Sequence, residues 1–433
     1  MSDRPNVLVV LTDQQRWDTT GPYTPMDLTP NLDRAAERGT RFDQTISNQP
    51  VCGPARGCLQ TGQYATTHGV WSNGIPLAAD RTMASAFRDA GYDTGYVGKW
   101  HLGGSGTDPS PPDTRSGYNY WRGADAIELT SHPYEGVIYD EDGDRVAFDG
   151  YRVDAMTDLA EEFVRRERDD PFFCFLSFLE PHQQNDLDYN EAYGAPDGYA
   201  RRFREHWVPP DLEGQPGHWQ HALPDYYGMC RRIDECYGRL LDALESDGLR
   251  EDTIVLFTSD HGCLFEAHPE GYKRSAREGA ARVPGVVTGP GFDRGEVVSD
   301  PVGLVDFPPT LLDAAGVAVP EAMEGESLLP VVSGGESRED VFVQISESKV
   351  GRALRTGRWT YVVRDPEMNG SDAPSSDRYV EQYLFDLDAD PYQQRNLAGH
   401  DRYHDVADGL RDRLRERIET VEGETPAIEP PGP

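Results

Sequence analysis

The segment NVLVVLT at residues 6–12 is an unbroken run of strand-forming residues that ends directly before Asp13 and Gln14. Runs of the same character recur as DTGYVG at 93–98, FFCFLSFLE at 172–180 and TIVLFTS at 253–259. A strand that is covered on both faces needs apolar side chains on both, so continuous runs of this kind predict a parallel sheet buried between helices.

Helical patterns alternate with these strands, near residues 30–39, 80–90, 151–168 and 225–247. This alternation predicts an α/β fold in which helices sandwich a large mixed, mostly parallel sheet. After about residue 335 the pattern changes to short strands joined by turns, followed by an amphipathic helix at 402–420. We therefore predict a main α/β domain over residues 1–335, a small antiparallel α+β subdomain over 336–422 and a flexible tail over 423–433.

The chain is strongly acidic along its whole length. It has 76 acidic and 41 basic residues, which gives a formal net charge of -35. The negative charges of such a surface repel one another in dilute buffer, but molar salt shortens the Debye length to about 3 Å and screens this repulsion. The charge therefore predicts a halophilic source, with an ordinary acidic protein as the alternative. Without a basic stripe or polybasic segment, we expect neither nucleic acid nor an anionic membrane as a partner.

The first residues, MSDRPNVLVVLTDQQ, hold an apolar run that is too short for a signal peptide. No later stretch approaches the roughly 20 apolar residues of a membrane span, so we expect a soluble, cytoplasmic protein. Six cysteines without an export signal and without a CxxC pair indicate neither a disulfide framework nor a structural zinc site. The oligomeric state stays open.

Polar residues follow the end of each predicted strand, and in an open parallel sheet ligands bind beyond the carboxyl ends of the strands. Asp13 and Gln14 follow the first run, and Asp260 and His261 follow the fourth. Two carboxylates, an amide oxygen and an imidazole suit a hard divalent cation. The alternative for each Asp is an N-cap at a strand-to-helix junction.

Basic side chains follow the other two runs. Lys99 and His101 come after the second run, and His182 comes after the third. The chain contains only three lysines, Lys99, Lys273 and Lys349, and uses arginine elsewhere. A retained ammonium indicates a task that a planar guanidinium performs less well, such as donating a proton from a compact group.

The segment VCGPARGCLQTG at 51–62 places Cys52 just before Pro54, at the start of a predicted helix. Backbone N–H groups at a helix N-terminus favour anions and lower the pKa of a thiol there. Arg56 lies where it could pair with such an anion. On these grounds Cys52 is either a reactive cysteine or a buried one.

Cys52, Pro54, Ala55 and Arg56, followed by Thr61 and Gly62, resemble the sulfatase signature C-x-P-[SA]-R-x4-T-G, in which the cysteine is oxidised to formylglycine. Further matches to sulfatases occur in the order of the family's motifs. They are NVLVVLTDQQ at 6–15, TPNLDRAAERGTRF at 29–42, GYDTGYVGKWHLGG at 91–104, PH at 181–182, SDHG at 259–262, Lys273 with RVP at 282–284, and YLFDLDADPYQQRNLAG at 383–399.

The resemblance implies an alkaline-phosphatase-like fold and hydrolysis of a sulfate ester to an alcohol and inorganic sulfate. By position, the resemblance assigns five ligands to a divalent cation: Asp13, Gln14, residue 52, Asp260 and His261. The ion it implies is Ca²⁺, with Mg²⁺ or Mn²⁺ as alternatives. It places around the sulfate the catalytic residues Cys52, Arg56, Lys99, His101, His182 and Lys273. The implied partners are a small-molecule or saccharide sulfate ester and, transiently, the formylglycine-generating machinery.

In the mechanism that the resemblance implies, one hydroxyl of the formylglycine hydrate attacks sulfur. His182 or Lys273 protonates the departing alkoxide, and a base such as His101 helps the second hydroxyl to expel sulfate. A serine ester would need water for this last step. The modified residue breaks its own intermediate.

Two positions depart from the commonest sulfatase pattern, because many members have Asp at the place of Gln14 and Asn at the place of His261. The version in this chain resembles the branch that contains choline-sulfatase and phosphonate monoester hydrolases. A phosphodiesterase or phosphonate monoester hydrolase is therefore the alternative activity. A third hypothesis is a binder of sulfated ligands without turnover, which the acid and base residues argue against.

The alcohol part of the substrate stays open. We expect the segments 104–150 and 183–224 to form the loops that choose it. Four aromatic residues of the second region could stack on a substrate ring or pack the loops on the core: Trp207, Trp219, Tyr226 and Tyr227. The histidines without motif context are interpreted as surface or core residues: His68, His132, His206, His218, His221 and His268.

Overall fold

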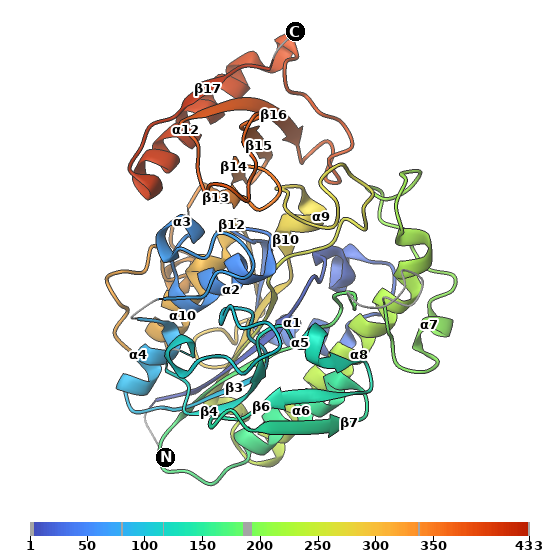
Figure 1. Ribbon diagram of the computed structural model, residues 1–433, viewed down its shortest axis with the longest axis vertical. Helices are drawn as coiled ribbons and strands as arrows, with labels where there is room; N and C mark the ends of the chain where they lie inside the picture. Colours follow the sequence, from blue (N-terminus) through green and yellow to red (C-terminus); the bar gives the residue numbers. More distant parts are fainter. Residues whose placement is uncertain (1–3, 79–80, 116, 185–192, 337, 432–433) are drawn as a thin grey trace.

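A computed structural model describes residues 4–78, 81–115, 117–184, 193–336 and 338–431. Its large sheet has the strand order β10-β2-β11-β9-β1-β8-β3-β4-β6-β5, with β12 beside β2 and β7 beside β6 (Figure 1). The strands are β1 (Asn6–Thr12), β2 (Thr40–Ile46), β3 (Asp93–Lys99), β4 (Tyr120–Ala124), β5 (Ser131–His132), β6 (Glu135–Tyr139), β7 (Arg145–Asp149), β8 (Phe172–Ser177), β9 (Thr253–Ser259), β10 (Arg282–Val283), β11 (Gly285–Thr288) and β12 (Glu296–Gly303).

The centre of this sheet is parallel. Strands β9, β1, β8, β3 and β4 all run in the same direction, with Leu11 of β1 opposite Ser177 of β8 and Thr258 of β9. Antiparallel strands flank this centre on both sides, β11 next to β9 and β6 next to β4. The prediction of a large mixed sheet with a parallel core is confirmed, and the four predicted strands are β1, β3, β8 and β9.

Helices cover both faces of the sheet. The side chains of a strand alternate between its faces, and the central strands carry apolar side chains on both, so each face needs a layer of helices. Val7, Val9 and Leu11 of β1 belong to a core with α2, α4 and α10, whereas Leu8 and Val10 belong to a core with α1, α6 and α8. The helices are α1 (Pro30–Arg38), α2 (Cys52–Thr61), α3 (Ala65–His68), α4 (Met83–Asp89), α5 (Ile127–Thr130), α6 (Arg152–Val164), α7 (Tyr199–Arg202), α8 (Trp219–Ser246), α9 (Glu278–Ala281), α10 (Phe307–Ala314), α11 (Leu329–Val332) and α12 (His404–Glu422).

A second sheet forms the upper part of the molecule in Figure 1. Its strands follow one another as β13 (Asp340–Ile345), β14 (Gly351–Thr356), β15 (Trp359–Arg364), β16 (Arg378–Asp386) and β17 (Ala427–Glu429). Residues on one face, such as Phe342, pack against α12. Residues on the other face, such as Val343, pack against Ile46 and Ala281 of the main body.

The C-terminal segment differs from the flexible tail expected over 423–433. Its residues Ala427–Glu429 form β17, which pairs in parallel with Arg378–Val380 of β16. The prolines of this segment argue against a strand, because proline has no N–H to donate to a neighbouring strand. An edge strand tolerates proline, since only one side of its backbone is paired. Among the described residues, no helix combines the length and apolarity needed to cross a lipid bilayer.

Candidate active site

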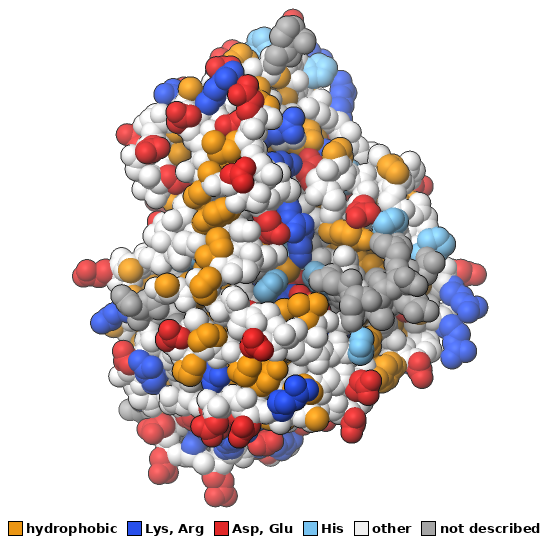
Figure 2. All heavy atoms as spheres, in the orientation of Figure 1, with side chains coloured by type: hydrophobic (Ala, Val, Ile, Leu, Met, Phe, Trp, Pro, Cys, Tyr) orange, Lys and Arg blue, Asp and Glu red, His pale blue; other side chains and the backbone are white. Residues whose placement is uncertain are grey.

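The carboxyl ends of the central parallel strands bring four segments together. Asp13 follows β1 and Asp260 follows β9, and these two strands pair directly, with Thr12 opposite Ser259. Lys99 ends β3, and His182 follows β8 beyond a cis peptide bond before Pro181. Figure 2 shows side chains of lysine, arginine and histidine gathered at a hollow in the middle of this face of the molecule.

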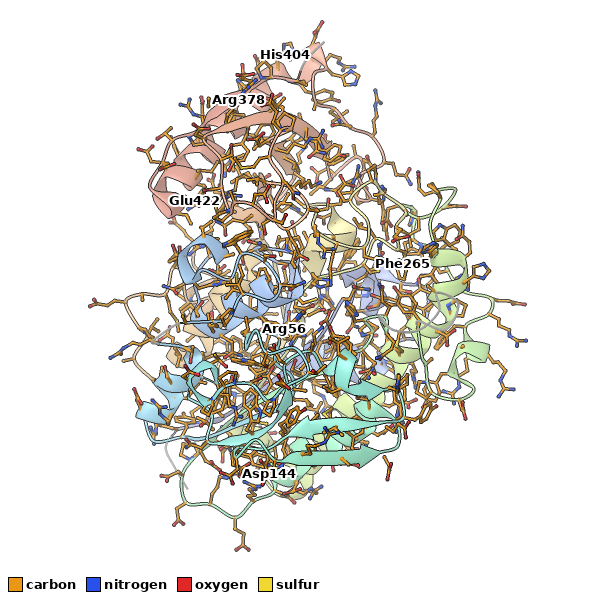
Figure 3. The ribbon with its side chains drawn as sticks, viewed as in Figure 1. Arg56, Asp144, Phe265, Arg378, His404 and Glu422 are labelled. Atoms are coloured by element: carbon orange, nitrogen blue, oxygen red, sulfur yellow. The ribbon has the colours of Figure 1, made fainter. Side chains whose placement is uncertain are left out.

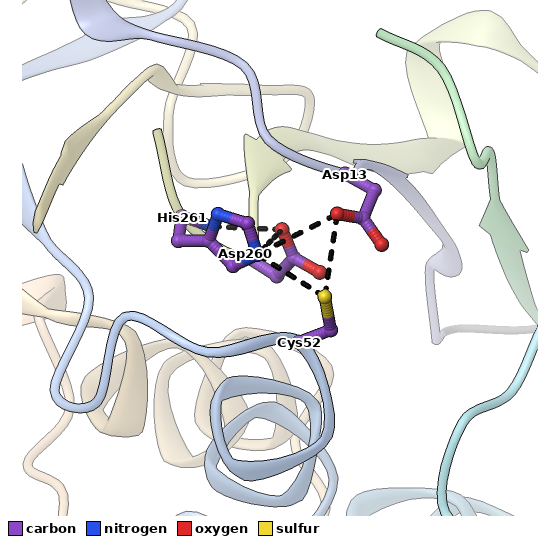
Figure 4. Close-up of side chains that lie close together, drawn as sticks. All are labelled: Asp13, Cys52, Asp260 and His261. Carbon is purple, nitrogen blue, oxygen red and sulfur yellow. Dashed lines mark hydrogen bonds and ion pairs between the residues drawn. The ribbon is translucent and has the colours of Figure 1, made fainter. Parts of the chain in front are cut away.

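Cys52 is the first residue of α2 and points at these strand ends. Its Sγ accepts a hydrogen bond from Lys273 Nζ at 2.8 Å. It lies 3.2 Å from His261 Nε2 and 3.6 Å from Asp13 Oδ1 (Figure 4). The side chain is 1% exposed. The structure thus places residue 52 where three predicted site residues converge.

The electrostatic surroundings of Cys52 favour an anion. Burial raises the pKa of the thiol, but the charges of Lys273, Lys99 and His261 lower it, and a hydrogen bond from His101 lowers it further. The pKa ends well below its ordinary value. By contrast, burial and the charge of Glu324 raise the pKa of Cys58 in the same helix. Position 52 is therefore built to carry negative charge.

Asp13 and Asp260 form a pair of fully buried carboxylates beside Cys52. Burial and Cys52 act to raise the pKa of Asp13, but Lys99, His182 and Arg56 hold it below its ordinary value. Burial and the neighbouring Asp13 raise the pKa of Asp260. Two carboxylates this close repel each other, and a cation between them would relieve the repulsion.

Arg56 joins both carboxylates from the second turn of α2. Its Nη2 lies 3.1 Å from Asp13 Oδ2 and 3.1 Å from Asp260 Oδ2, and its Nη1 donates to Lys99 O at 2.8 Å. The label on Arg56 in Figure 3 marks this position, at the centre of the molecule. Arg56 therefore lies in the site as the sequence predicted, and it anchors the two carboxylates.

Four of the predicted ligands have the donor set of a divalent cation site. Single ligand atoms of Asp13, Cys52, Asp260 and His261 all lie within 4.8 Å of one another. The Nδ1–H of His261 donates to Gly262 O at 2.8 Å, so that in its neutral form, the form that binds a cation, the imidazole turns its Nε2 lone pair toward the cluster. Carboxylate oxygens with one imidazole fit a hard or borderline divalent ion.

Gln14, the residue after Asp13, offers a further oxygen, and its N–H donates to Asp260 Oδ1 at 3.1 Å. Its Nε2 donates to Cys263 Sγ and to Gln183 Oε1, each at 3.4 Å. Its Oε1 is buried and has no hydrogen-bond partner among the described residues. A buried amide oxygen without a partner costs free energy unless a ligand takes its lone pair. The residues present therefore fit a cation.

The remaining predicted residues surround the same point. Lys273 Nζ lies 3.2 Å from His182 Nε2 and 3.3 Å from His261 Nε2. His182 Nδ1 donates to Gln183 O, so its Nε2 accepts from Lys273. His101 has a left-handed backbone, with φ of +58°, and its Nδ1 is buried without a partner in the described structure. Every predicted site residue thus lies in one cluster.

Sequence reasoning missed two residues that complete this cluster. Glu128, on the four-residue helix α5, lies with Oε1 3.2 Å from Lys99 Nζ. Ser177 accepts a hydrogen bond from Arg56 Nη1 at 2.6 Å. Ser177 ends the observed strand β8, but it lies inside the run predicted as a strand over 172–180 and so carried no strand-end signal. Glu128 carried no signal, because α5 is too short to give a periodic pattern.

Of the four aromatic residues considered for substrate stacking, two are buried in the core and two are partly exposed. Tyr226 and Tyr227 are 0% and 1% exposed on α8, so they pack the core and do not stack on a substrate. Trp207 and Trp219 are half-buried. Residues 185–192 of the expected substrate loop 183–224 lie outside the described residues.

Comparisons with known proteins agree with this geometry. A family model described as Sulfatase matches residues 5–317, and one described as N-sulphoglucosamine sulphohydrolase, C-terminal, matches residues 270–420. The chain is 31% identical over 443 residues to the ulvan-active sulfatase of Formosa agariphila, which covers 96% of this chain and 81% of that protein. It is 26% identical over 492 residues to the N-acetylglucosamine-6-O-sulfatase of Bacteroides thetaiotaomicron, which covers 92% and 84%.

Solved structures share the fold over nearly the whole chain. The yidJ protein of Bacteroides fragilis superposes with a TM-score of 0.83 at 25% identity, over 98% of this chain and 97% of that one. The phosphonate monoester hydrolase of Agrobacterium radiobacter superposes with a TM-score of 0.74 at 23% identity, over 97% and 96%, which shows a common fold alone. The family model spans most of the chain and includes the whole cluster around Cys52, and on this basis the chain belongs to the sulfatase family.

Proposed function

We propose that this chain hydrolyses a sulfate ester to an alcohol and inorganic sulfate, with residue 52 as formylglycine beside a divalent cation. The observation that carries the proposal is the surroundings of Cys52 Sγ. One atom at a helix N-terminus meets the ammonium of Lys273, the imidazole of His261 and the carboxylate of Asp13. Anion-stabilising groups and cation ligands around one nucleophilic position suit attack on a tetrahedral sulfate.

Asp13, Gln14, Asp260 and His261 would hold the cation, together with residue 52. Ca²⁺ is the ion we propose, with Mg²⁺ or Mn²⁺ as alternatives, because most of these ligand atoms are oxygens. When present, the cation and the formylglycine hydrate supply polarisation of a sulfate oxygen and a nucleophilic hydroxyl. The side chains of this protein supply the rest.

Lys273 and His182 are placed to protonate the alcohol as it leaves. Lys273 Nζ lies within hydrogen-bond distance of both Cys52 Sγ and His182 Nε2. As the bond between sulfur and the alcohol oxygen breaks, that oxygen takes a proton from Lys273 Nζ, or from His182 Nε2 when that imidazole is protonated on both nitrogens. Lys99 and Arg56 stay positively charged next to Asp13 and stabilise charge on the other sulfate oxygens.

The substrate we propose is a small-molecule or saccharide sulfate ester. Support comes from the sulfatase relatives, one of which bears the name of a sugar sulfatase. A phosphodiester or phosphonate monoester is the second candidate. Two observations favour this candidate: the neutral ligands Gln14 and His261 leave more positive charge on the cation, and a phosphonate monoester hydrolase shares the fold.

Rates on matched substrates test the proposal. Purified protein should hydrolyse a nitrophenyl sulfate faster than a nitrophenyl phosphonate monoester or phosphodiester. Chelation followed by dialysis should remove this activity, and added Ca²⁺, Mg²⁺ or Mn²⁺ should restore it. The opposite order of rates would transfer the assignment to the phosphonate activity. Full activity in verified metal-free protein would overturn the cation assignment. Binding of a sulfated ligand without turnover would favour the hypothesis of a non-catalytic binder.

A further inference from the structure

Gln14 has a backbone conformation that is uncommon for a residue with a long side chain. Its φ is +69°, in the left-handed region. It lies in the short connection from β1 to the single-turn helix η1 (Trp17–Thr19), where its N–H donates to Asp260 Oδ1 at 3.1 Å. A conformation of this kind persists only when the surrounding structure holds it.

One hydroxyl group holds the backbone that follows Gln14. The hydroxyl of Tyr226 donates to Gln14 O at 2.7 Å and accepts from Arg16 N at 2.8 Å. A phenol can donate and accept at the same time, so this single oxygen fixes the peptide groups on both sides of Gln15. No local pattern reveals this contact, because Tyr226 and Gln14 are 212 positions apart.

The ring of Tyr226 is itself held in place. It lies on the long helix α8, is 0% exposed and packs edge-on against Phe265, with the ring centroids 5.0 Å apart. Phe265 is labelled in Figure 3, beside α8. The hydroxyl is therefore delivered by a rigid element and not by a loop.

Arg16, the other partner of this hydroxyl, is anchored independently. Its guanidinium pairs with Asp18 at 2.7 Å and with Asp211 at 2.8 Å, and it donates to Cys263 O at 2.8 Å. All three charged groups are buried. Tyr226 thus ties Gln14 to an already fixed part of the structure.

We propose that Tyr226 is a positioning residue for the cation. Its hydroxyl holds Gln14 in the backbone conformation from which the side-chain oxygen Oε1 serves as a ligand, while Nε2 is engaged by Cys263. The inference rests on the proposed function, because it takes Gln14 as a cation ligand. Groups that orient metal ligands commonly change metal affinity by about 10- to 100-fold when they are removed.

The experiment measures affinity for Ca²⁺ alone, by titration calorimetry on metal-depleted protein. Tyr226→Phe keeps the ring and should weaken Ca²⁺ binding by about tenfold or more. Tyr227→Phe is the matched control: this residue is the next on α8, is 1% exposed, and donates to Trp207 O at 3.1 Å, away from Gln14. Its affinity should equal that of the wild type.

Gln14→Ala separates this inference from the proposed function. Gln14→Ala alone should weaken binding, and adding Tyr226→Phe should weaken it no further, because both changes act through one oxygen. Wild-type affinity in Tyr226→Phe, or a full additional loss in the double variant, would overturn the role of Tyr226 and leave the cation site standing. A wild-type protein that binds none of Ca²⁺, Mg²⁺ and Mn²⁺ would overturn the cation assignment and this inference with it.

A measurement on the unmodified chain keeps the test valid even if Tyr226→Phe fails to fold. Coupling between two sites is reciprocal, so if the Tyr226 contact favours Ca²⁺ binding, Ca²⁺ must favour the contact. Hydrogen exchange of the Arg16 amide, which donates to this hydroxyl, should therefore slow when Ca²⁺ is added. Exchange at Arg16 that does not respond to saturating Ca²⁺ would overturn the inference.

Discussion

The ammonium group of Lys99 neutralises two buried carboxylates of the site, those of Asp13 and Glu128. Its Nζ lies 2.9 Å from Asp13 Oδ2 and 3.2 Å from Glu128 Oε1, and the side chain is 0% exposed. Burial acts to lower the pKa of Lys99, but the two carboxylates raise it well above its ordinary value. An ammonium has three N–H donors, so one remains for an anionic ligand after both carboxylates are bound.

Cys52→Ser should abolish most turnover, because a serine hydroxyl cannot become the aldehyde hydrate. We expect kcat to fall by more than about 10³-fold while metal binding and the unfolding midpoint are retained. Cys58→Ser, in the same helix but turned away from the cluster, is the control and should keep its activity. Mass spectrometry of the tryptic peptide from Phe42 to Arg56 should show an aldehyde that reacts with hydrazine. A fully active protein with only a thiol at position 52 would refute the formylglycine mechanism.

Glu128→Gln should make the protein less stable at neutral pH. Burial acts to raise the pKa of Glu128, but Lys99, His101 and His182 lower it from 4.5 to about 2. A carboxyl group whose pKa is lower in the folded than in the unfolded chain stabilises the fold at any pH above the unfolded pKa. This contribution disappears as the pH falls through the folded pKa. We expect the wild type to exceed Glu128→Gln by about 3 kcal/mol in unfolding free energy at pH 7.

Urea unfolding of the two proteins between pH 7 and pH 3.5 checks this expectation. The difference in unfolding free energy should be constant above about pH 4.5 and shrink by about 1.4 kcal/mol for each pH unit below it. Glu213→Gln, which changes an exposed glutamate, should follow the wild type throughout. A difference that is independent of pH would mean that Glu128 acts by packing alone.

At the scale of elements, helices α2 and α3 are locked together by one histidine. A Cβ atom on Gly57 of α2 would lie 2.4 Å from His68 Cε1, so the helices approach this closely only because residue 57 is glycine. His68, the last residue of α3, is 8% exposed, and its Nδ1 accepts a hydrogen bond from Val70 N at 3.1 Å. His68 is therefore a core residue, and the contact fixes the helix that carries Cys52.

The protein should lose stability as the pH falls from 6.5 toward 4 because of His68. Burial lowers the pKa of His68 from 6.5 to about 4, so in this range the unfolded chain binds a proton that the folded chain does not. Unfolding free energy should fall by about 1.4 kcal/mol for each pH unit across this window from this residue. His68→Gln can still accept from Val70 N and should remove this part of the pH dependence, whereas His400→Gln, at an exposed position, should not. Identical pH profiles for His68→Gln and wild type would show that folding does not lower the pKa of His68.

At the scale of the whole molecule, ion pairs join the second sheet to the main body, and one of them is buried. Arg355 of β14 contacts Glu278 of α9 with both ends of its guanidinium, at 2.7 and 3.1 Å. Arg274, the residue after Lys273, has its N–H bonded to Pro50 O at 3.0 Å and its guanidinium 2.6 Å from Glu347, in the connection between β13 and β14. The second sheet therefore supports the segment that carries Lys273 as well as packing on the main body.

The surface charge of the whole molecule makes its stability depend on salt. A formal net charge of -35 on one compact body repels itself strongly where screening is weak. The unfolding midpoint should rise from dilute buffer to molar KCl, and sucrose at equal osmolality should produce a smaller rise. A midpoint that stays constant across the KCl series would remove the halophilic interpretation.

Local sequence patterns determined the strands, the long helices and the edge of the sheet at which the site lies. The run at 6–12 predicts a strand from its own residues, and parallel strands must end at the same edge, so Asp13 and Asp260 could be expected to meet. The choice of Cys52, Arg56, Lys99, His101, His182 and Lys273 rested on resemblance to sulfatases, which the family match supports. Their distances and charges did not follow from that resemblance.

Only the tertiary structure decided which distant groups complete the site. Glu128 reaches Lys99 from a four-residue helix, Tyr226 reaches Gln14 across 212 positions, and Ala427–Glu429 become a strand only because β16 offers an edge. The segments of Glu128 and of Ala427–Glu429 have no period of their own, and the helical pattern around Tyr226 predicts its helix but not its partner. Periodicity reports which face of an element is buried, whereas the partner of a buried polar atom depends on how separate elements pack, and that is fixed by the whole chain.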